Sequence, residues 1–135
     1  MKNSKVLKVI LFISGLLLTI IGGAILFMPI EFFARSGVVL DNDVSLLNNV
    51  RSSGGIVMAS GILILLGSFV KRLAFTSTVI STLIFLSWGI SRAIAMAIDG
   101  IPADALIKAT IVEIVIGLVG AFALAKYRNK ETKNV

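Results

Sequence analysis

Two residues of opposite charge lie inside long apolar stretches, and they are the strongest candidates for chemistry in this chain. Arg92 belongs to the third of four such stretches and Glu113 to the fourth. Hydrocarbon strongly disfavours an isolated charge, so ionisable residues in such surroundings usually pair with each other, face a cavity or serve a function. Arg92 and Glu113 therefore indicate an ion pair, a site, or both.

Helix geometry places these two charges at similar depth. Arg92 precedes Ile98, the end of its stretch, by six residues, and Glu113 follows Ala105, the start of its stretch, by eight. At a rise of 1.5 Å per residue, the two positions lie about 9 Å and about 12 Å below the same end of a helical hairpin. We expect the two side chains to contact each other from adjacent helices.

Four further residues complete a predicted polar pocket at the outer end of the bundle. One is an arginine at the mouth of the second stretch, one a glutamate that ends the first stretch, and one a threonine on the Glu113 face. The fourth is a tryptophan one turn below Arg92, whose ring could stack on the guanidinium. The candidate ligand-binding residues are Arg51, Arg92, Glu113, Glu31, Trp88 and Thr110. We assign no catalytic residue and no metal ligand.

Three interpretations of the charged pair stay open on sequence alone. Buried charges are often paired for structural reasons, so the pair could only lock the bundle. Two arginines against one deep carboxylate favour a site for an anionic or polar ligand. By analogy with relay acids in transporters, Glu113 could also carry a proton.

The composition indicates a membrane protein. The chain has 135 residues, of which 57% are hydrophobic and 15% charged, and its mean hydropathy is +1.03. Soluble domains carry about 25% charged residues. The net charge of +6 comes from basic residues at the ends of the apolar stretches, where they act as topology signals, so nucleic acid is not an expected partner.

The chain contains no cysteine and no histidine. This excludes disulfides, thiolate nucleophiles, zinc sites built from Cys and His, and haem or iron–sulfur ligation by those residues. No cofactor is expected. A membrane-embedded enzyme would have to rely on Glu113, Glu31 and the loop aspartates alone, so an enzyme is the least favoured class.

The apolar stretches predict an all-α fold, a membrane four-helix bundle in a single four-span domain over residues 1–135. A spanning helix needs about 20 mostly apolar residues, and all four stretches are long enough. They cover about residues 6–30, 52–70, 73–98 and 105–125. Lysine and arginine concentrate before the first stretch, between the second and third, and after the fourth, which places both termini in the cytoplasm.

The first outer loop, residues 31–50, is predicted to contain a short interfacial helix. Its first half is apolar, which suggests a segment lying in the membrane interface. Asp43 is a plausible N-cap for a short helix that runs into the second span. Small residues at heptad spacing predict close helix packing. They are Gly15 and Gly22, then Gly54, Gly61 and Ser68, and finally Gly117, Gly120 and Ala121 on the Glu113 face.

Three short motifs resemble a family of small bacterial membrane proteins catalogued as domain of unknown function 4345. They are the stretch from Leu47 to Gly55 (LNNVRSSGG), the step Gly89-Ile-Ser-Arg92, and Glu113 in the last stretch. The resemblance covers nearly the whole chain. It implies a four-helix protein of the bacterial inner membrane and matches Arg51, Arg92 and Glu113 to the family pattern. It implies no reaction.

Two functions compete. The first is a non-enzymatic membrane protein whose outward pocket binds an anionic small ligand or a lipid headgroup, or supports a membrane-protein partner. The alternative is a small proton-coupled transporter that uses Glu113. An adjacent arginine favours the ionised carboxylate, which makes a salt-bridged glutamate a poor proton carrier. Membrane lipids are expected to surround the protein, and homo-oligomers are left open.

Overall fold

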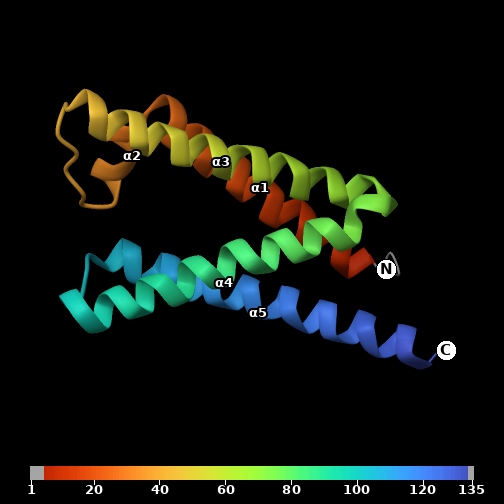
Figure 1. Ribbon diagram of the computed structural model, residues 1–135. Helices are drawn as coiled ribbons and strands as arrows, with labels where there is room; N and C mark the ends of the chain where they lie inside the picture. Colours follow the sequence, from red (N-terminus) through yellow and green to blue (C-terminus); the bar gives the residue numbers. More distant parts are fainter. Residues whose placement is uncertain (1–4, 134–135) are drawn as a thin grey trace.

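The computed structural model describes residues 5–133, with side chains as far as residue 126, and this part of the chain is helical without strands. Figure 1 shows the order of its elements. They are α1 (Lys5–Phe27), α2 (Pro29–Arg35), α3 (Val44–Phe69), the 3-10 turn η1 (Lys71–Leu73), α4 (Ala74–Asp99) and α5 (Asp104–Lys133). The four long helices are long and apolar enough to span a membrane, as expected for a multi-pass membrane protein. The predicted all-α fold is confirmed.

The first spanning helix ends earlier than predicted. α1 stops at Phe27, and Met28 takes a non-helical conformation with φ −134° and ψ 58°. Pro29 is the cause, because a proline disfavours the helical conformation of the residue before it. The chain then restarts as α2, so Glu31 lies in the first turn of this short helix and does not end the first span.

The third helix begins with the predicted cap. The Asp43 carboxylate accepts a hydrogen bond from the backbone N–H of Leu46 at 2.8 Å. This satisfies one of the N–H groups that a helix start leaves without a partner. The capped segment does not form a separate helix, since α3 is continuous from Val44 to Phe69. The separate short helix in this loop is α2.

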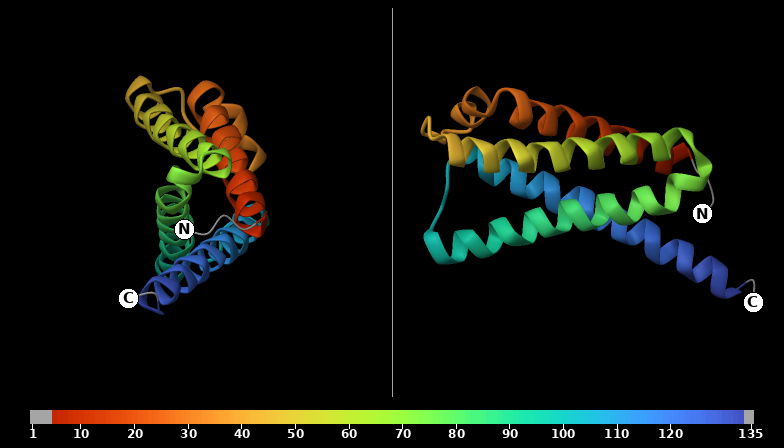
Figure 2. Two further views of the ribbon diagram at one scale, coloured as in Figure 1. Left: turned by 90° about the vertical axis from the view of Figure 1, so that its right-hand side faces the viewer. Right: turned by 45° about the horizontal axis from the view of Figure 1, so that its top comes forward.

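The long helices form two antiparallel pairs, α1 with α3 and α4 with α5. One end of the molecule holds the start of α1 and η1, and we call it the basic end. The other end holds α2, the loop 36–43 and the turn 100–103, and we call it the cavity end. Figures 1 and 2 show that α4 lies close to α3 at the basic end and diverges from it toward the cavity end.

Glycines bring α1 and α3 into backbone contact, as the heptad spacing predicts. A Cβ atom built on Gly54 would lie 2.7 Å from the backbone nitrogen of Leu26 and 2.9 Å from the carbonyl oxygen of Gly22. Gly15 and Gly61 face each other in the same way nearer the basic end. Membrane helices use small residues for such close approach. The α1–α3 pair is therefore tightly packed along most of its length.

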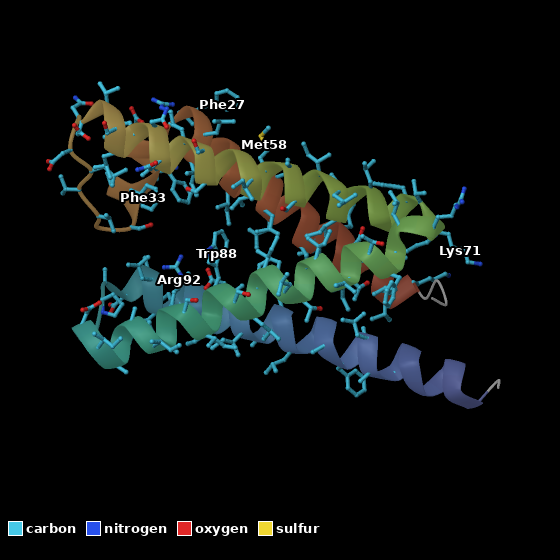
Figure 3. The ribbon with its side chains drawn as sticks, in the orientation of Figure 1. Phe27, Phe33, Met58, Lys71, Trp88 and Arg92 are labelled. Atoms are coloured by element: carbon cyan, nitrogen blue, oxygen red, sulfur yellow. The ribbon has the colours of Figure 1, made fainter. Side chains whose placement is uncertain are left out.

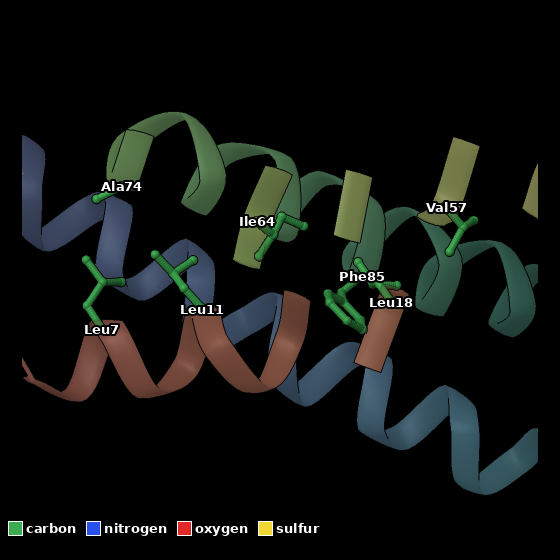
Figure 4. Packing of buried hydrophobic residues seen from close by; sticks show 7 residues of the cluster. All are labelled: Leu7, Leu11, Leu18, Val57, Ile64, Ala74 and Phe85. Carbon is green, nitrogen blue, oxygen red and sulfur yellow. The ribbon is translucent and has the colours of Figure 1, made fainter. Parts of the chain in front are cut away.

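The buried core occupies the basic end and the middle of the bundle. Figure 4 shows side chains from α1, α3 and α4 meeting there. They are Leu7, Leu11, Leu18, Val57, Ile64, Ala74 and Phe85. Hydroxyl groups of α4 are buried beside them. Ser77 donates to the Leu63 carbonyl of α3 at 3.0 Å, and Thr82 donates to the Thr78 carbonyl at 2.7 Å.

Candidate functional site

Arg92 and Glu113 form the ion pair that helix geometry predicts. The Nε atom of Arg92 donates to both carboxylate oxygens of Glu113, at 3.2 Å to Oε1 and 3.1 Å to Oε2. α4 and α5 position the two side chains, since these helices form a hairpin closed by the turn 100–103. Gly89 permits the close approach, because a Cβ there would lie 2.5 Å from the Ile114 side chain. The pair thus ties the two helices together.

The two partners differ in accessibility. The Glu113 side chain is 9% exposed and the Arg92 side chain 34% exposed. Because the Nε–H serves both carboxylate oxygens, the four N–H groups on the two terminal nitrogens of Arg92 have no protein acceptor within the described residues. The more exposed part of the pair is therefore a set of hydrogen-bond donors, and the Glu113 carboxylate is the more buried part.

A cavity of about 500 Å³ lies beside the pair at the cavity end. Ligand sites typically have volumes of about 300–1,000 Å³. All of the helices contribute to its wall. The lining residues are Ile21, Ile25, Phe32, Phe33, Ser36, Val38, Ser53, Ile56, Val57, Trp88, Arg92, Ala105, Leu106, Ala109 and Glu113. Among them, Arg92 and Glu113 carry charge, and most of the rest are apolar.

Figure 3 shows how the labelled residues lie around this space. Arg92 and Trp88 point from α4 toward the α1–α3 pair, and Phe33 lies on the side of α2 that faces them. Trp88 is half-buried and packs against the core. No stacking contact between Trp88 and the guanidinium is present in the described part, so the tryptophan contributes a wall of the cavity.

Arg51 lies outside this cavity. Its Nη1 atom donates to the backbone oxygens of Leu26 at 2.6 Å and Phe27 at 3.2 Å. These carbonyls belong to the last turn of α1, where a helix leaves its acceptors without partners. A positive charge is also favourable at this end of the helix dipole. The break at Pro29 exposes these carbonyls, and Arg51 is turned toward them instead of toward Arg92.

The structure does not bring two other candidates into the cavity. Glu31 is exposed on α2 and is not one of the lining residues. Thr110 is buried, and its hydroxyl donates to the backbone oxygen of Leu106 in its own helix at 2.8 Å. A threonine hydroxyl in a helix commonly bonds to the carbonyl four residues earlier, and this local acceptor competes with the more distant carboxylate. Within the described residues, Arg92 is therefore the one side-chain partner of Glu113.

Sequence reasoning did not assign the apolar part of the site. Phe32 and Phe33 of α2 pack edge to face, with ring centroids 5.4 Å apart, and both line the cavity. Ala109 faces the cavity four residues before Glu113. The sequence signals for these residues are the apolar first half of the loop 31–50 and the small residue Ala109 one turn before Glu113. Neither signal shows that α2 and α5 face each other across a cavity.

A second, smaller cavity of about 200 Å³ lies nearer the turn between α4 and α5. Arg92 and Leu106 line both cavities, and Asp99 and Pro102 line only the smaller one. Arg92 therefore stands at the boundary between the main cavity and the cavity end of the molecule. Among the side chains that the structure describes, residues 5–126, no group of three acidic residues is placed to hold a metal ion.

Comparison with known proteins identifies a family for this chain. The family model described as "Domain of unknown function (DUF4345)" matches residues 6–124, which is most of the chain. No curated protein and no solved structure matches. The matched range contains both charged residues and every residue that lines the main cavity.

Proposed function

Because the chain belongs to the family described as Domain of unknown function (DUF4345), and because that description carries no activity, we propose a function from the geometry of the site. The protein is a non-enzymatic membrane protein whose cavity binds a small ligand with an anionic oxygen group. Arg92 is the binding residue, and Glu113 fixes the orientation of its guanidinium.

The observation that carries this proposal is the free set of donors on Arg92. Arg92 and Glu113 both line a cavity whose other walls are mostly apolar, and Arg92, with four N–H groups not used by Glu113, is the more exposed of the two. Hydrogen bonds from a guanidinium to an anionic oxygen are about twice as strong as neutral ones. A ligand that presents such an oxygen therefore gains more from this site than a neutral one.

The net charge of the site differs from the charge predicted from the sequence. Two arginines near one carboxylate gave an excess of positive charge, but Arg51 serves the end of α1 instead. Arg92 and Glu113 alone form a neutral pair. Preference for an anion then rests on the greater exposure of the donors on Arg92 than of the Glu113 carboxylate. The same contact keeps Glu113 paired, which disfavours the alternative of a proton-carrying carboxylate.

The location of the protein is part of the same proposal. The basic residues Lys5, Lys8, Lys71 and Arg72 lie at the basic end. Positive residues favour the cytoplasmic side of a membrane. We place the basic end in the cytoplasm of a bacterium, the four helices in its inner membrane, and the cavity end on the outer side.

Native mass spectrometry of the protein purified from membranes tests the binding site. We expect an anionic adduct on the wild-type chain and its loss in the Arg92→Gln/Glu113→Gln double variant, which leaves no unpaired charge and keeps a polar side chain at both positions. Arg51→Gln is the matched control, because it also removes one arginine at the cavity end but not from the cavity. An adduct that survives in the double variant would refute the proposal.

A further inference from the structure

We infer that the ligand is a single-chain amphiphile, with an anionic headgroup on Arg92 and an apolar chain in the space between α4 and the α1–α3 pair. This inference rests on the proposed function and deepens it by naming the ligand class. The proposed function requires only an anionic group. The apolar chain is inferred from the walls, the depth and the volume of the cavity.

The walls of the cavity divide by chemistry. The charged pair comes from α4 and α5, whereas α1 and α3 contribute Ile21, Ile25, Ile56 and Val57 to the opposite side. A small inorganic anion would occupy the neighbourhood of Arg92 and leave this apolar wall in contact with water. Removing apolar surface from water is favourable, by about 25 cal/mol per Å². A ligand with an apolar chain uses both parts of the cavity.

The direction of the helices orders these parts by depth. α4 runs from the basic end to the cavity end, so Trp88 lies one turn deeper in the bundle than Arg92, about 6 Å along the helix axis. Arg92 also lines the smaller cavity toward the turn 100–103. The headgroup position is therefore nearest the end of the bundle, and the chain points inward past Trp88. Amphiphiles in the outer leaflet of the membrane have the same orientation.

The volume favours one chain. The main cavity holds about 500 Å³, in the range of sites for drug-sized molecules. That size suits one acyl chain with a compact headgroup and is too small for two full chains with a phospholipid headgroup.

The cover over the end of the cavity comes from α2 and the loop that follows it. The loop after α2 lies against the α4–α5 turn, where a Cβ built on Gly37 would be 3.5 Å from the Cβ of Ala103. α2 itself packs against α1 and α3, and no extensive packing joins α2 to α4 or α5 within residues 5–133. The cavity is covered at its end, and few backbone contacts hold this cover to α4 and α5, so a small movement of α2 would admit a ligand from the lipid.

Trp88 provides a direct measurement, because it is the chain's one tryptophan and lines the cavity. The protein would be placed in phosphatidylcholine nanodiscs and titrated with a dibrominated C18 fatty acid, whose bromine atoms quench tryptophan fluorescence. The methyl ester of the same acid controls for partition into the lipid. We expect saturable quenching by the acid at a concentration at least tenfold lower than by the ester.

Two variants test where the chain lies. Ala109→Phe adds bulk to the cavity wall, and Ile111→Phe adds the same ring on an exposed face of α5 that does not line the cavity. We expect Ala109→Phe to lower the affinity for the brominated acid at least tenfold. Ile111→Phe should leave that affinity unchanged. The Arg92→Gln/Glu113→Gln variant should remove the difference between acid and ester.

The outcomes separate this inference from the proposed function. If inorganic phosphate displaces the native adduct while the brominated acid and its ester quench alike, the site binds a free anion. The inference that the ligand is an amphiphile is then wrong. If Ala109→Phe binds the acid as well as the wild type does, the chain does not lie in the cavity. If the double variant retains the native adduct, the proposed function fails as well.

Discussion

The basic end and the cavity end of this bundle satisfy polar groups in different ways. At the basic end, hydroxyl groups of α4 donate to backbone carbonyls, and Ser77 reaches α3 through a single hydrogen bond. At the cavity end, the Arg92 guanidinium binds Glu113 of α5, and within the described residues no hydrogen bond joins it to α1 or α3. Short hydroxyl side chains allow α4 to lie close to α3, whereas the long charged pair joins α4 to α5 and leaves space beside it.

This difference shows how a membrane bundle can be tightly packed and still contain a cavity. Glycines hold α1 to α3 along most of their length, and α4 is held to α5 both by glycine contacts, such as Gly117 against Leu86, and by the charged pair. The two pairs meet through the core around Leu18, Ile64 and Phe85. Beyond that core, no side-chain hydrogen bond in the described residues joins the pairs. The cavity lies where this connection ends.

The largest expected effect concerns the placement of the two ends on opposite sides of the membrane. The chain has no cysteine, so Asn42→Cys and Lys71→Cys each introduce one thiol, at the cavity end and the basic end respectively. A membrane-impermeant maleimide should label Asn42→Cys in cells with a permeabilised outer membrane and Lys71→Cys only after lysis. The cysteine-free wild type is the blank. Equal labelling of both variants in unlysed cells would contradict the proposed topology.

The next largest effect should come from breaking the charged pair. Removing one partner of a buried pair costs about 3–5 kcal/mol of unfolding free energy, because it leaves a charge alone in apolar surroundings. Arg92→Leu should be the worse variant, since Glu113 is nearly buried whereas Arg92 is partly exposed to the cavity. Unfolding by denaturant in detergent micelles measures the loss.

The double variant Arg92→Leu/Glu113→Leu tests the pairing itself. It leaves no unpaired charge, so it should recover part of the stability that either single variant loses. If the two single losses simply add in the double variant, the contact contributes no coupling. The charged pair would then not be what joins α4 to α5 at the cavity end.

A smaller effect separates two adjacent glycines of α3. Gly54 faces α1, where an added Cβ would meet the Leu26 backbone nitrogen at 2.7 Å, whereas nothing lies within 4 Å of a Cβ on Gly55. Gly54→Ala should lower the unfolding free energy by about 1–3 kcal/mol through overpacking. Gly55→Ala should leave it unchanged or raise it by about 0.5–1 kcal/mol, because alanine favours the helix. Thermal unfolding followed by circular dichroism compares them, and equal stabilities would contradict the α1–α3 packing.

The sequence predicts the parts of this structure that depend on spacing along a helix. The four spans follow from the length of the apolar stretches, the Asp43 cap from the residue type at the helix start, and the contact between Arg92 and Glu113 from the rise per residue. Arg51 does not follow, because its partners become available only when Pro29 ends α1 early. A long side chain can reach several acceptors, and spacing alone does not choose among them.

The smallest effect should be that of Arg51→Gln, and it tests whether the two arginines of the cavity end have separate roles. Arg51 is bound to the last carbonyls of α1, so its loss should remove a helix cap and lower the unfolding free energy by about 1 kcal/mol. Thermal unfolding in detergent measures this change, and native mass spectrometry of the same sample measures the adduct. The adduct should remain at wild-type level, because the cap lies outside the cavity. An adduct lost in Arg51→Gln would return Arg51 to the binding site and end the distinction between an arginine that caps a helix and one that holds a ligand.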